Sequence, residues 1–291
     1  MKILFLTHFY YPHIGGVEKH VYEVRKYLER KGNSVKVVSE ADIKYPKMKF
    51  IGLIYIWIWL FRNRNIVQKA DIVHVHDVFI WYLPFRFLYP YKKVIATIHG
   101  LEWDTPLSKA SIWQKKLTFR LSAKTIGVGN FLEKYLGIKF DRIIYGASST
   151  QRGRLLKNNN SFVYVGRLEK NTGLLKFLSW LKANQKSKVD FCGDGELRNQ
   201  CEKYGKVHGF CDPIPFLKKA EYCVPGGYLA ALEGLSYKCK LKLFWNNKVK
   251  EDYWKMSPFW KLKGNKLEKW AKEQTWEKLA NEYLTLYNNI Q

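Results

Sequence analysis

Two adjacent glycines, Gly15 and Gly16, follow the first apolar segment of the chain and precede its first helical pattern. A loop at this place exposes backbone N–H groups at the positive end of a helix, where they can hold a phosphate. Two glycines also remove the side chains that would keep a ligand away from the backbone. The pattern therefore indicates a phosphate-binding loop, with an ordinary turn as the alternative.

Two histidines, His74 and His76, alternate along an expected strand and so point to the same face of it. Such a pair can bind a metal ion, but no third candidate ligand accompanies it, and we expect no metal site. The five cysteines form no C-x-x-C pair, so neither a zinc site nor a disulfide framework is indicated.

The elements that must position these residues alternate between strand and helix. Residues 3–8 form an apolar strand-like segment, and residues 17–31 carry apolar side chains at helical spacing. Such alternation predicts a parallel sheet covered by helices on both faces. Further short strands rich in β-branched residues are expected at 35–38, 72–75, 94–98 and 125–128.

The same pattern starts again after a polar segment at residues 146–160, which we interpret as a linker. Strands are then expected at 162–166 and 188–192, with a helix at 173–184 between them. Apolar side chains at helical spacing predict one or two helices over 266–290. The resulting division is an N-terminal domain over 1–150, a C-terminal domain over 151–272 and a closing helix over 273–291.

The excess of basic over acidic residues indicates the charge of the partner. The 291 residues include 50 Lys and Arg against 25 Asp and Glu, which gives a formal net charge of +25. Such a field attracts anionic partners, whether nucleotide-sugars, anionic lipids or nucleic acid. The longest apolar run, residues 50–61, is too short to cross a membrane. Residues 2–6 are typical of a first strand rather than of a signal peptide, so we expect a cytoplasmic protein.

A series of motifs runs through the chain in a fixed order and spacing. They are Pro12 to Glu18 (P-x-x-G-G-x-E), Asp71 to His76, Ala96 to Gly100, Tyr145 and Gly146, Val165 to Leu168, Gly193 to Glu196, and Thr275 to Glu277 with Leu286 and Tyr287. This series resembles the group 1 glycosyltransferases, glycosyltransferase family four. The resemblance covers nearly the whole chain and implies a GT-B fold, with two Rossmann-like domains facing each other across a cleft and a C-terminal helix returning to the first domain.

This resemblance implies transfer of a sugar from a UDP-, GDP- or ADP-sugar, with retention at the anomeric carbon, no obligatory metal and no cofactor. The leaving diphosphate develops negative charge, which arginine, lysine and backbone donors stabilise. The acceptor expected for the first domain is a glycan or a lipid-linked sugar, or a soluble molecule.

The resemblance also assigns roles to residues. Two of these residues also have a structural alternative. Arg167 can be an ordinary surface arginine, and His99 can be a hydrogen-bonded core histidine. The implied roles are Gly15, Gly16, Arg167, Lys170 and Thr172 for the donor diphosphate; His99 as the catalytic histidine at the donor sugar; Glu233, Gly193 and Asp194 for the nucleotide and its ribose; and Pro225, Gly226 and Gly227 beside the sugar.

Two positions depart from the family pattern. Thr172 stands where a lysine usually follows the arginine by five residues, although Lys170 lies two residues earlier. Pro225 stands where the first glutamate of the E-x7-E motif would touch the sugar, and proline has no carboxylate. These departures favour a second hypothesis, a nucleotide-sugar-binding protein that has lost catalysis. A nucleic-acid-binding protein is the third, but no motif of that class is found, and we expect no nucleic acid partner.

Residues 50–61, which are followed by Arg62 and Arg64, and residues 79–93 combine aromatic with basic side chains. Such segments suit an anionic membrane surface, and a buried helix is the equal alternative for the first of them. The membrane interpretation predicts a peripheral protein on the cytoplasmic face, held by about 1 kcal/mol per engaged Lys or Arg.

Overall fold

The computed structural model describes residues 1–290 except 14, 47, 102–107, 150–154 and 185–187. The described chain divides into two compact units. Unit 1 comprises the described residues of 1–101 and 108–144 together with the C-terminal residues from Trp276 onward. Unit 2 runs from Tyr145 to Thr275.

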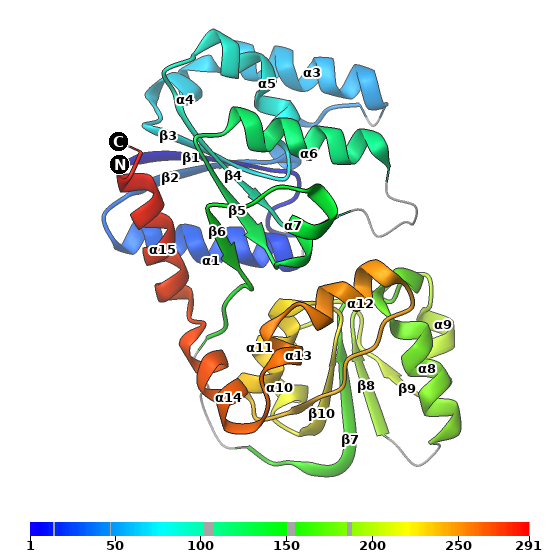
Figure 1. The fold of residues 1–291 in the computed structure, drawn as a ribbon. Coiled ribbons are helices and arrows are strands. Elements are labelled where there is room, and N and C mark those ends of the chain that lie inside the picture. The colour runs from blue at the N-terminus through cyan, green and yellow to red at the C-terminus, as the bar shows by residue number, and fades with distance from the viewer. Residues whose placement is uncertain (14, 47, 102–107, 150–154, 185–187, 291) are drawn as a thin grey trace. The chain divides into compact units, whose positions relative to one another are not determined.

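Unit 1 is built on a six-stranded sheet in the order β2-β1-β3-β4-β5-β6. All of its neighbouring strands are parallel, as the alternating sequence pattern predicts. Because the sheet is covered on both faces (Figure 1), its strands are almost continuously apolar. The strands are β1 (Lys2–Thr7), β2 (Ser34–Val38), β3 (Ile72–His76), β4 (Lys93–Ile98), β5 (Lys124–Val128) and β6 (Arg142–Ile144).

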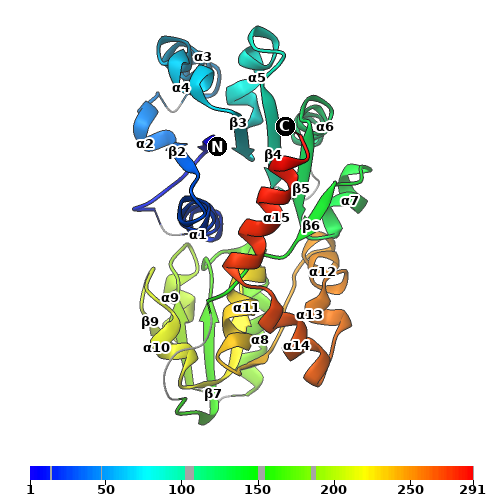
Figure 2. The ribbon, with the colours of Figure 1, turned by 90° about the vertical axis from the view of Figure 1, so that its left-hand side faces the viewer.

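Eight helices belong to the described part of unit 1, and the last of them comes from the C-terminus of the chain. Helix α15 packs against α1 (Figures 1 and 2), and its Tyr283 and Tyr287 are fully buried there. The helices are α1 (Gly16–Arg30), α2 (Glu40–Ile43), α3 (Lys49–Arg62), α4 (Arg64–Lys69), α5 (Phe79–Leu88), α6 (Lys109–Leu121), α7 (Phe131–Leu136) and α15 (Trp276–Asn288).

Helix α3 has two different apolar faces. Ile56 and Leu60 are buried in the core of unit 1, and the Trp57 indole nitrogen donates a 2.9 Å hydrogen bond to the carbonyl oxygen of Ile80 in α5. The opposite face is also apolar, but it is open to solvent. Six of its side chains are between 45% and 84% exposed: Phe50, Ile51, Ile54, Tyr55, Ile58 and Phe61.

Unit 2 repeats the architecture with a five-stranded sheet in the order β11-β10-β7-β8-β9, again with parallel neighbours. Along β7, Phe162 and Tyr164 face one apolar cluster while Val163 faces another, as the two-residue period of a strand requires. The strands are β7 (Asn158–Val165), β8 (Lys188–Cys192), β9 (Gly205–Val207), β10 (Ala220–Pro225) and β11 (Lys240–Leu241).

The helices of unit 2 lie on both faces of this sheet (Figure 1), and the five cysteines of the chain are free thiols within the unit. The helical elements are a 3-10 turn η1 (Lys170–Thr172) and α8 (Leu174–Ala183), α9 (Arg198–Cys201), α10 (Ile214–Leu217), α11 (Tyr228–Ser236), α12 (Lys248–Lys255), α13 (Pro258–Lys261) and α14 (Gly264–Glu273).

Candidate functional site

The Gly15-Gly16 loop lies between β1 and α1. Gly15 is the N-terminal cap of α1 in an extended conformation, and Gly16 begins the helix. Beside this loop, a His13 ring nitrogen lies 2.7 Å from a carboxylate oxygen of Glu18, which is buried in the first turn of α1. The helix terminus has open space at Gly16, where an added β-carbon would meet no atom within 4 Å.

Four histidines of unit 1 form a network, in which His20, His74 and His76 are buried and His99 is partly buried. The ring nitrogens of His76 and His99 share a 3.0 Å hydrogen bond. His74 hydrogen-bonds through one nitrogen to Thr97 (2.8 Å) and through the other to the Tyr287 hydroxyl (2.6 Å). These contacts join β3, the end of β4 and the C-terminal helix α15, so segments far apart in sequence fix the position of His99.

The network keeps its histidines neutral. Burial lowers the pKa of His20, His74 and His76 well below the ordinary value. Burial and then the charge of Lys115 lower the pKa of His99 to about 3. Among the residues that the structure describes, no group of three or more histidine, cysteine or acidic side chains is arranged to bind a metal ion.

In unit 2, three glycine-containing loops meet at the carboxyl ends of adjacent strands. Gly166 follows β7, Gly193 follows β8 and Gly226 follows β10. The backbone N–H of Gly166 donates to the carbonyl of Cys192 (3.1 Å), and that of Gly226 donates to the carbonyl of Val165 (2.8 Å). A β-carbon on Gly193 would overlap the Gly166 carbonyl oxygen, so this close packing requires glycine. Ligands of open α/β sheets bind at this edge.

Arg167 directly follows Gly166, and its side chain is 53% exposed. Its guanidinium lies 3.0 Å from a carboxylate oxygen of Glu169, an ion pair between two surface groups. Surface pairs of this kind are worth about 0–1 kcal/mol, so an arriving diphosphate can replace Glu169 at little cost.

The other two candidates for the diphosphate are engaged elsewhere. The Lys170 ammonium lies 3.5 Å from Glu196, and its backbone N–H donates to the same carboxylate. Thr172 is 9% exposed, and its hydroxyl donates a 2.7 Å hydrogen bond to the carbonyl of Glu169. The hydroxyl of Tyr164 donates to that of Thr172 (3.0 Å), so Thr172 fixes the shape of the loop that follows Arg167.

Of the residues assigned to the nucleotide, Gly193 and Asp194 follow β8 at the same edge of unit 2. One carboxylate oxygen of Asp194 accepts from the backbone of Gly195 (2.9 Å), and the other accepts from the Arg198 guanidinium (2.8 Å). Glu233 is 9% exposed within α11.

Pro225 ends β10, and Gly226 and Gly227 connect this strand to α11. At the start of α11, the backbone N–H of Tyr228 donates to the Tyr253 hydroxyl (2.6 Å). This contact holds α12 against the loop of Gly226 and Gly227.

Lys250 of α12 is only 2% exposed and was not predicted from the sequence as a site residue. Its ammonium donates a 2.7 Å hydrogen bond to the carbonyl oxygen of Gly226. The surrounding segment, K-V-K-E-D-Y-W-K, is typical of a solvated helix. No local signal in this sequence shows that one of its charges is buried.

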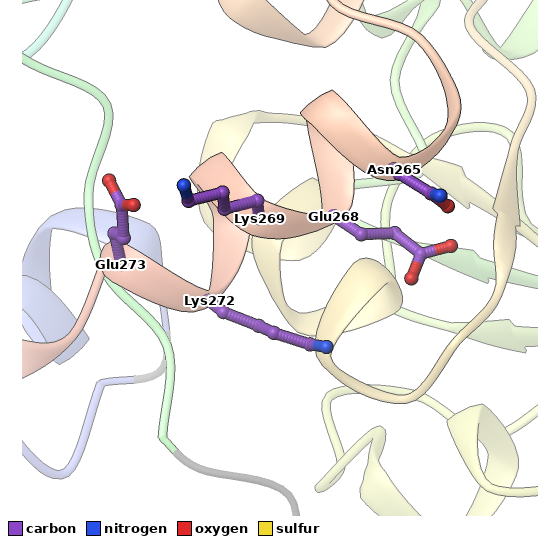
Figure 3. A pocket seen from close by; sticks show the side chains of 5 residues that line it. All are labelled: Asn265, Glu268, Lys269, Lys272 and Glu273. Carbon is purple, nitrogen blue, oxygen red and sulfur yellow. The ribbon is translucent and has the colours of Figure 1, made fainter.

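A shallow hollow of about 400 Å³ lies on the face of a single helix, α14 (Figure 3). Its lining consists of one asparagine, two acidic and two basic side chains and contains none of the candidate residues described above. We therefore do not place a substrate there. The lining residues are Asn265, Glu268, Lys269, Lys272 and Glu273.

Among known protein families, one family model matches the first part of the chain. Residues 14–143 match the model described as Glycosyltransferase Family 4. The resemblance to this family is confirmed for this segment. No curated protein sequence matches the chain.

Solved structures with the same fold cover nearly the whole chain at low identity. HepE of Anabaena in complex with UDP-glucose is similar over 98% of this chain and 99% of its own, with a TM-score of 0.64 and 13% identity. UDP-GlcNAc 2-epimerase from Methanocaldococcus jannaschii is similar over 99% and 100%, with a TM-score of 0.55 and 12% identity. These neighbours confirm the predicted GT-B fold class, with its two Rossmann-like sheets.

A third neighbour matches less of its own length. A mutant of TarM from S. aureus, solved with fondaparinux, alpha-GlcNAc-glycerol and UDP, is similar over 82% of this chain and 59% of its own, with a TM-score of 0.56 and 13% identity. In the described part of our chain, no helix combines the length and the apolar character needed to span a bilayer.

Proposed function

We propose that this protein is a retaining glycosyltransferase that takes a sugar from a nucleoside diphosphate sugar. The observation that carries the proposal is the edge of unit 2, where three glycine loops converge and Arg167 follows the first of them. The match of residues 14–143 to glycosyltransferase family 4 and the UDP complexes of neighbours with this fold support the same donor class.

In this proposal the donor diphosphate binds at the glycine loops of unit 2. As the bond to the sugar breaks, negative charge grows on the diphosphate, and Arg167 stabilises it more strongly in the transition state than in the bound donor. Glu233 binds the ribose, and Gly193 and Asp194 lie beside the nucleotide. The neutral His99 of unit 1 would act on a sugar as a hydrogen-bonding group rather than as a cation.

Isothermal titration with UDP, GDP and ADP tests the donor site. Loss of a charge-assisted hydrogen bond to a phosphate weakens binding by about 10- to 100-fold, so we expect Arg167→Ala to lower the affinity of the preferred nucleotide by this factor. Lys206→Ala, an exposed lysine on β9, is the matched control. If the wild-type protein binds none of the three nucleotides, the assignment of the donor site is wrong.

A UDP-sugar-binding or epimerising protein is the second candidate. It is favoured by Pro225, which offers no carboxylate to the sugar, and by the similarity in fold to UDP-GlcNAc 2-epimerase. Such a protein would bind the donor as strongly but would release no sugar to an acceptor. Nucleotide binding with a changed sugar and no transfer would therefore favour this candidate.

We further propose that the outer face of α3 docks unit 1 on an anionic membrane, where a lipid-linked acceptor is reached. The six exposed apolar side chains form a stripe along this helix, and Arg62 and Arg64 follow it. Apolar side chains with flanking cations suit the boundary between acyl chains and anionic headgroups. The net charge of +25 favours the same surface.

Sedimentation with vesicles that contain anionic phospholipid tests this docking. The double variant Ile54→Asp with Ile58→Asp changes two half-exposed side chains, so it should fold normally and lose binding. Phe210→Asp, a 52% exposed apolar residue of unit 2, should bind as the wild type does. Equal binding by both variants would show that α3 is not the docking surface, and complete release by salt would show that charge alone holds the protein.

A further inference from the structure

Lys250 lies at the same edge of unit 2 as the proposed donor site. Its ammonium is anchored on the carbonyl oxygen of Gly226 and is enclosed by aromatic rings. The nitrogen lies 4.1 Å from the centre of the Tyr253 ring and 5.1 Å from that of Trp254. These contacts fix the position of a cation that would otherwise move freely at the end of a long side chain.

Lys250 is also connected to Arg167 through the glycine loops. A β-carbon on Gly166, the residue before Arg167, would lie 2.9 Å from the Cα of Gly226. Burial and then the charge of Arg167 lower the pKa of Lys250 to about 7. The charges of the two cations therefore interact, and an anion that displaces Glu169 from Arg167 would be attracted by both.

The family pattern places a lysine five residues after the arginine, and this chain has Thr172 there. Thr172 carries no charge and its hydroxyl is used inside the loop, and the Lys170 side chain is 67% exposed. Lys250, in contrast, reaches the loops from α12 as a buried cation.

We propose that Lys250 binds the donor diphosphate together with Arg167, in place of the lysine that Thr172 replaces. This inference rests on the proposed function of unit 2 as a nucleotide-sugar site. The ammonium is a compact point charge with three donors, so it can keep its bond to Gly226 while it donates to a phosphate oxygen.

The test compares the affinities of UDP and UMP, or of the corresponding pair if GDP or ADP binds better. We expect Lys250→Met to weaken UDP binding by about 10- to 100-fold and UMP binding by less than about 3-fold, because the contact is made to the diphosphate. Lys250→Arg should restore part of the preference for UDP. Lys248→Met, two residues earlier on the exposed side of α12, is the control and should bind both nucleotides normally.

Proton uptake provides a second readout that does not depend on a variant. Among the described residues, Arg167 and the ring of Tyr253 lie near the ammonium, Tyr228 stacks on Tyr253, and Asp252 follows two residues later on the same helix. Burial raises the pKa of both tyrosines, so they keep their protons at pH 8. Since Lys250 is largely neutral at pH 8, UDP binding should draw a proton onto it, as measured by titration in buffers of different ionisation enthalpy.

The outcomes separate this inference from the proposed function. If the wild-type protein binds no nucleotide, the proposed function fails. A second outcome is that Arg167→Ala loses UDP binding, whereas Lys250→Met keeps it and takes up as many protons as the wild type. The donor site is then correct, and Lys250 has only a structural role. Should Lys250→Met fail to fold, Lys250→Gln replaces it in the comparison of UDP with UMP affinity. Independently of any variant, an absence of proton uptake by the wild-type protein at pH 8 overturns the inference.

Discussion

Acidification is expected to destabilise unit 1, because its buried histidines are neutral in the folded state. The ordinary histidine pKa is 6.5, and that of His99 is lowered to about 3 by burial and by the charge of Lys115. Below pH 6.5 the unfolded chain therefore binds more protons than the folded one. The stabilising contribution is present above pH 6.5 and is lost as the pH falls toward the folded-state pKa.

The size of the effect follows from this difference in pKa. At pH 5 the solution is about 1.5 units below the unfolded-state pKa, so His99 alone removes up to about 2 kcal/mol at 1.36 kcal/mol per unit. His20, His74 and His76 act in the same direction, because burial lowers the pKa of each. Since a domain is stable by only about 5–15 kcal/mol, this loss is a large part of the total.

Urea unfolding at pH 7.5, 6 and 5, followed by hydrogen exchange in β3 and β4, measures the change in unit 1. We expect the wild type to lose much of the protection of these strands as the pH falls from 7.5 to 5. In His99→Gln, the free energy lost over the same pH range should be smaller by up to about 2 kcal/mol. His13→Gln, whose side chain is 55% exposed, should change little. Equal stability at pH 7.5 and pH 5 would refute the argument, as would an unchanged acid loss in His99→Gln.

Three further predictions concern single positions. Gly193→Ala should cost more than about 3 kcal/mol, because the β-carbon would overlap a backbone carbonyl, whereas Gly16→Ala should be neutral or slightly stabilising; melting temperatures test both. Tyr283→Phe should lower the free energy of unfolding by about 1–3 kcal/mol, because it leaves the buried His20 and Thr97 without this hydrogen-bond partner. Tyr91→Phe, at a 92% exposed tyrosine, should not change it; urea unfolding measures both. Between pH 7 and pH 9 the stability of the ligand-free wild type should rise by about 2 kcal/mol relative to that of Lys250→Met, because the unfolded chain still holds the Lys250 proton there and the folded chain does not; urea unfolding of both proteins at the two pH values tests this difference.

The regular part of the fold was predictable from sequence because periodicity reports burial directly. The strands at 72–75 and 94–98 and the helix at 17–31 are found within one or two residues of the predicted bounds. The shortest elements gave too few residues for a pattern: β6 has three and β11 has two.

The buried-helix alternative for residues 50–61 holds for one side of the helix, and the membrane interpretation of the other side stays a prediction. Ile56 and Leu60 are buried, while Ile54 and Ile58 are half exposed. An apolar run has no polar face, so its sequence alone does not show which side is buried.

The site was predictable only where a motif marks it. The glycines and Arg167 follow strands, so their place at the carboxyl edge of a sheet could be inferred. Lys250 could not be inferred, because its burial depends on the packing of α12 against Gly226 and not on its neighbours in sequence. The same holds for Thr172, whose hydroxyl is used within a loop.

The most direct test of the account is NMR analysis of the products formed from UDP-, GDP- and ADP-sugars with a lipid extract as the source of acceptor. We predict release of one nucleoside diphosphate, transfer of the sugar with the anomeric configuration of the donor retained, and a rate reduced at least about 100-fold in Arg167→Ala. Inversion of the configuration would contradict the proposed retaining reaction. A donor that is bound and epimerised, or bound and left unchanged, would contradict glycosyl transfer itself.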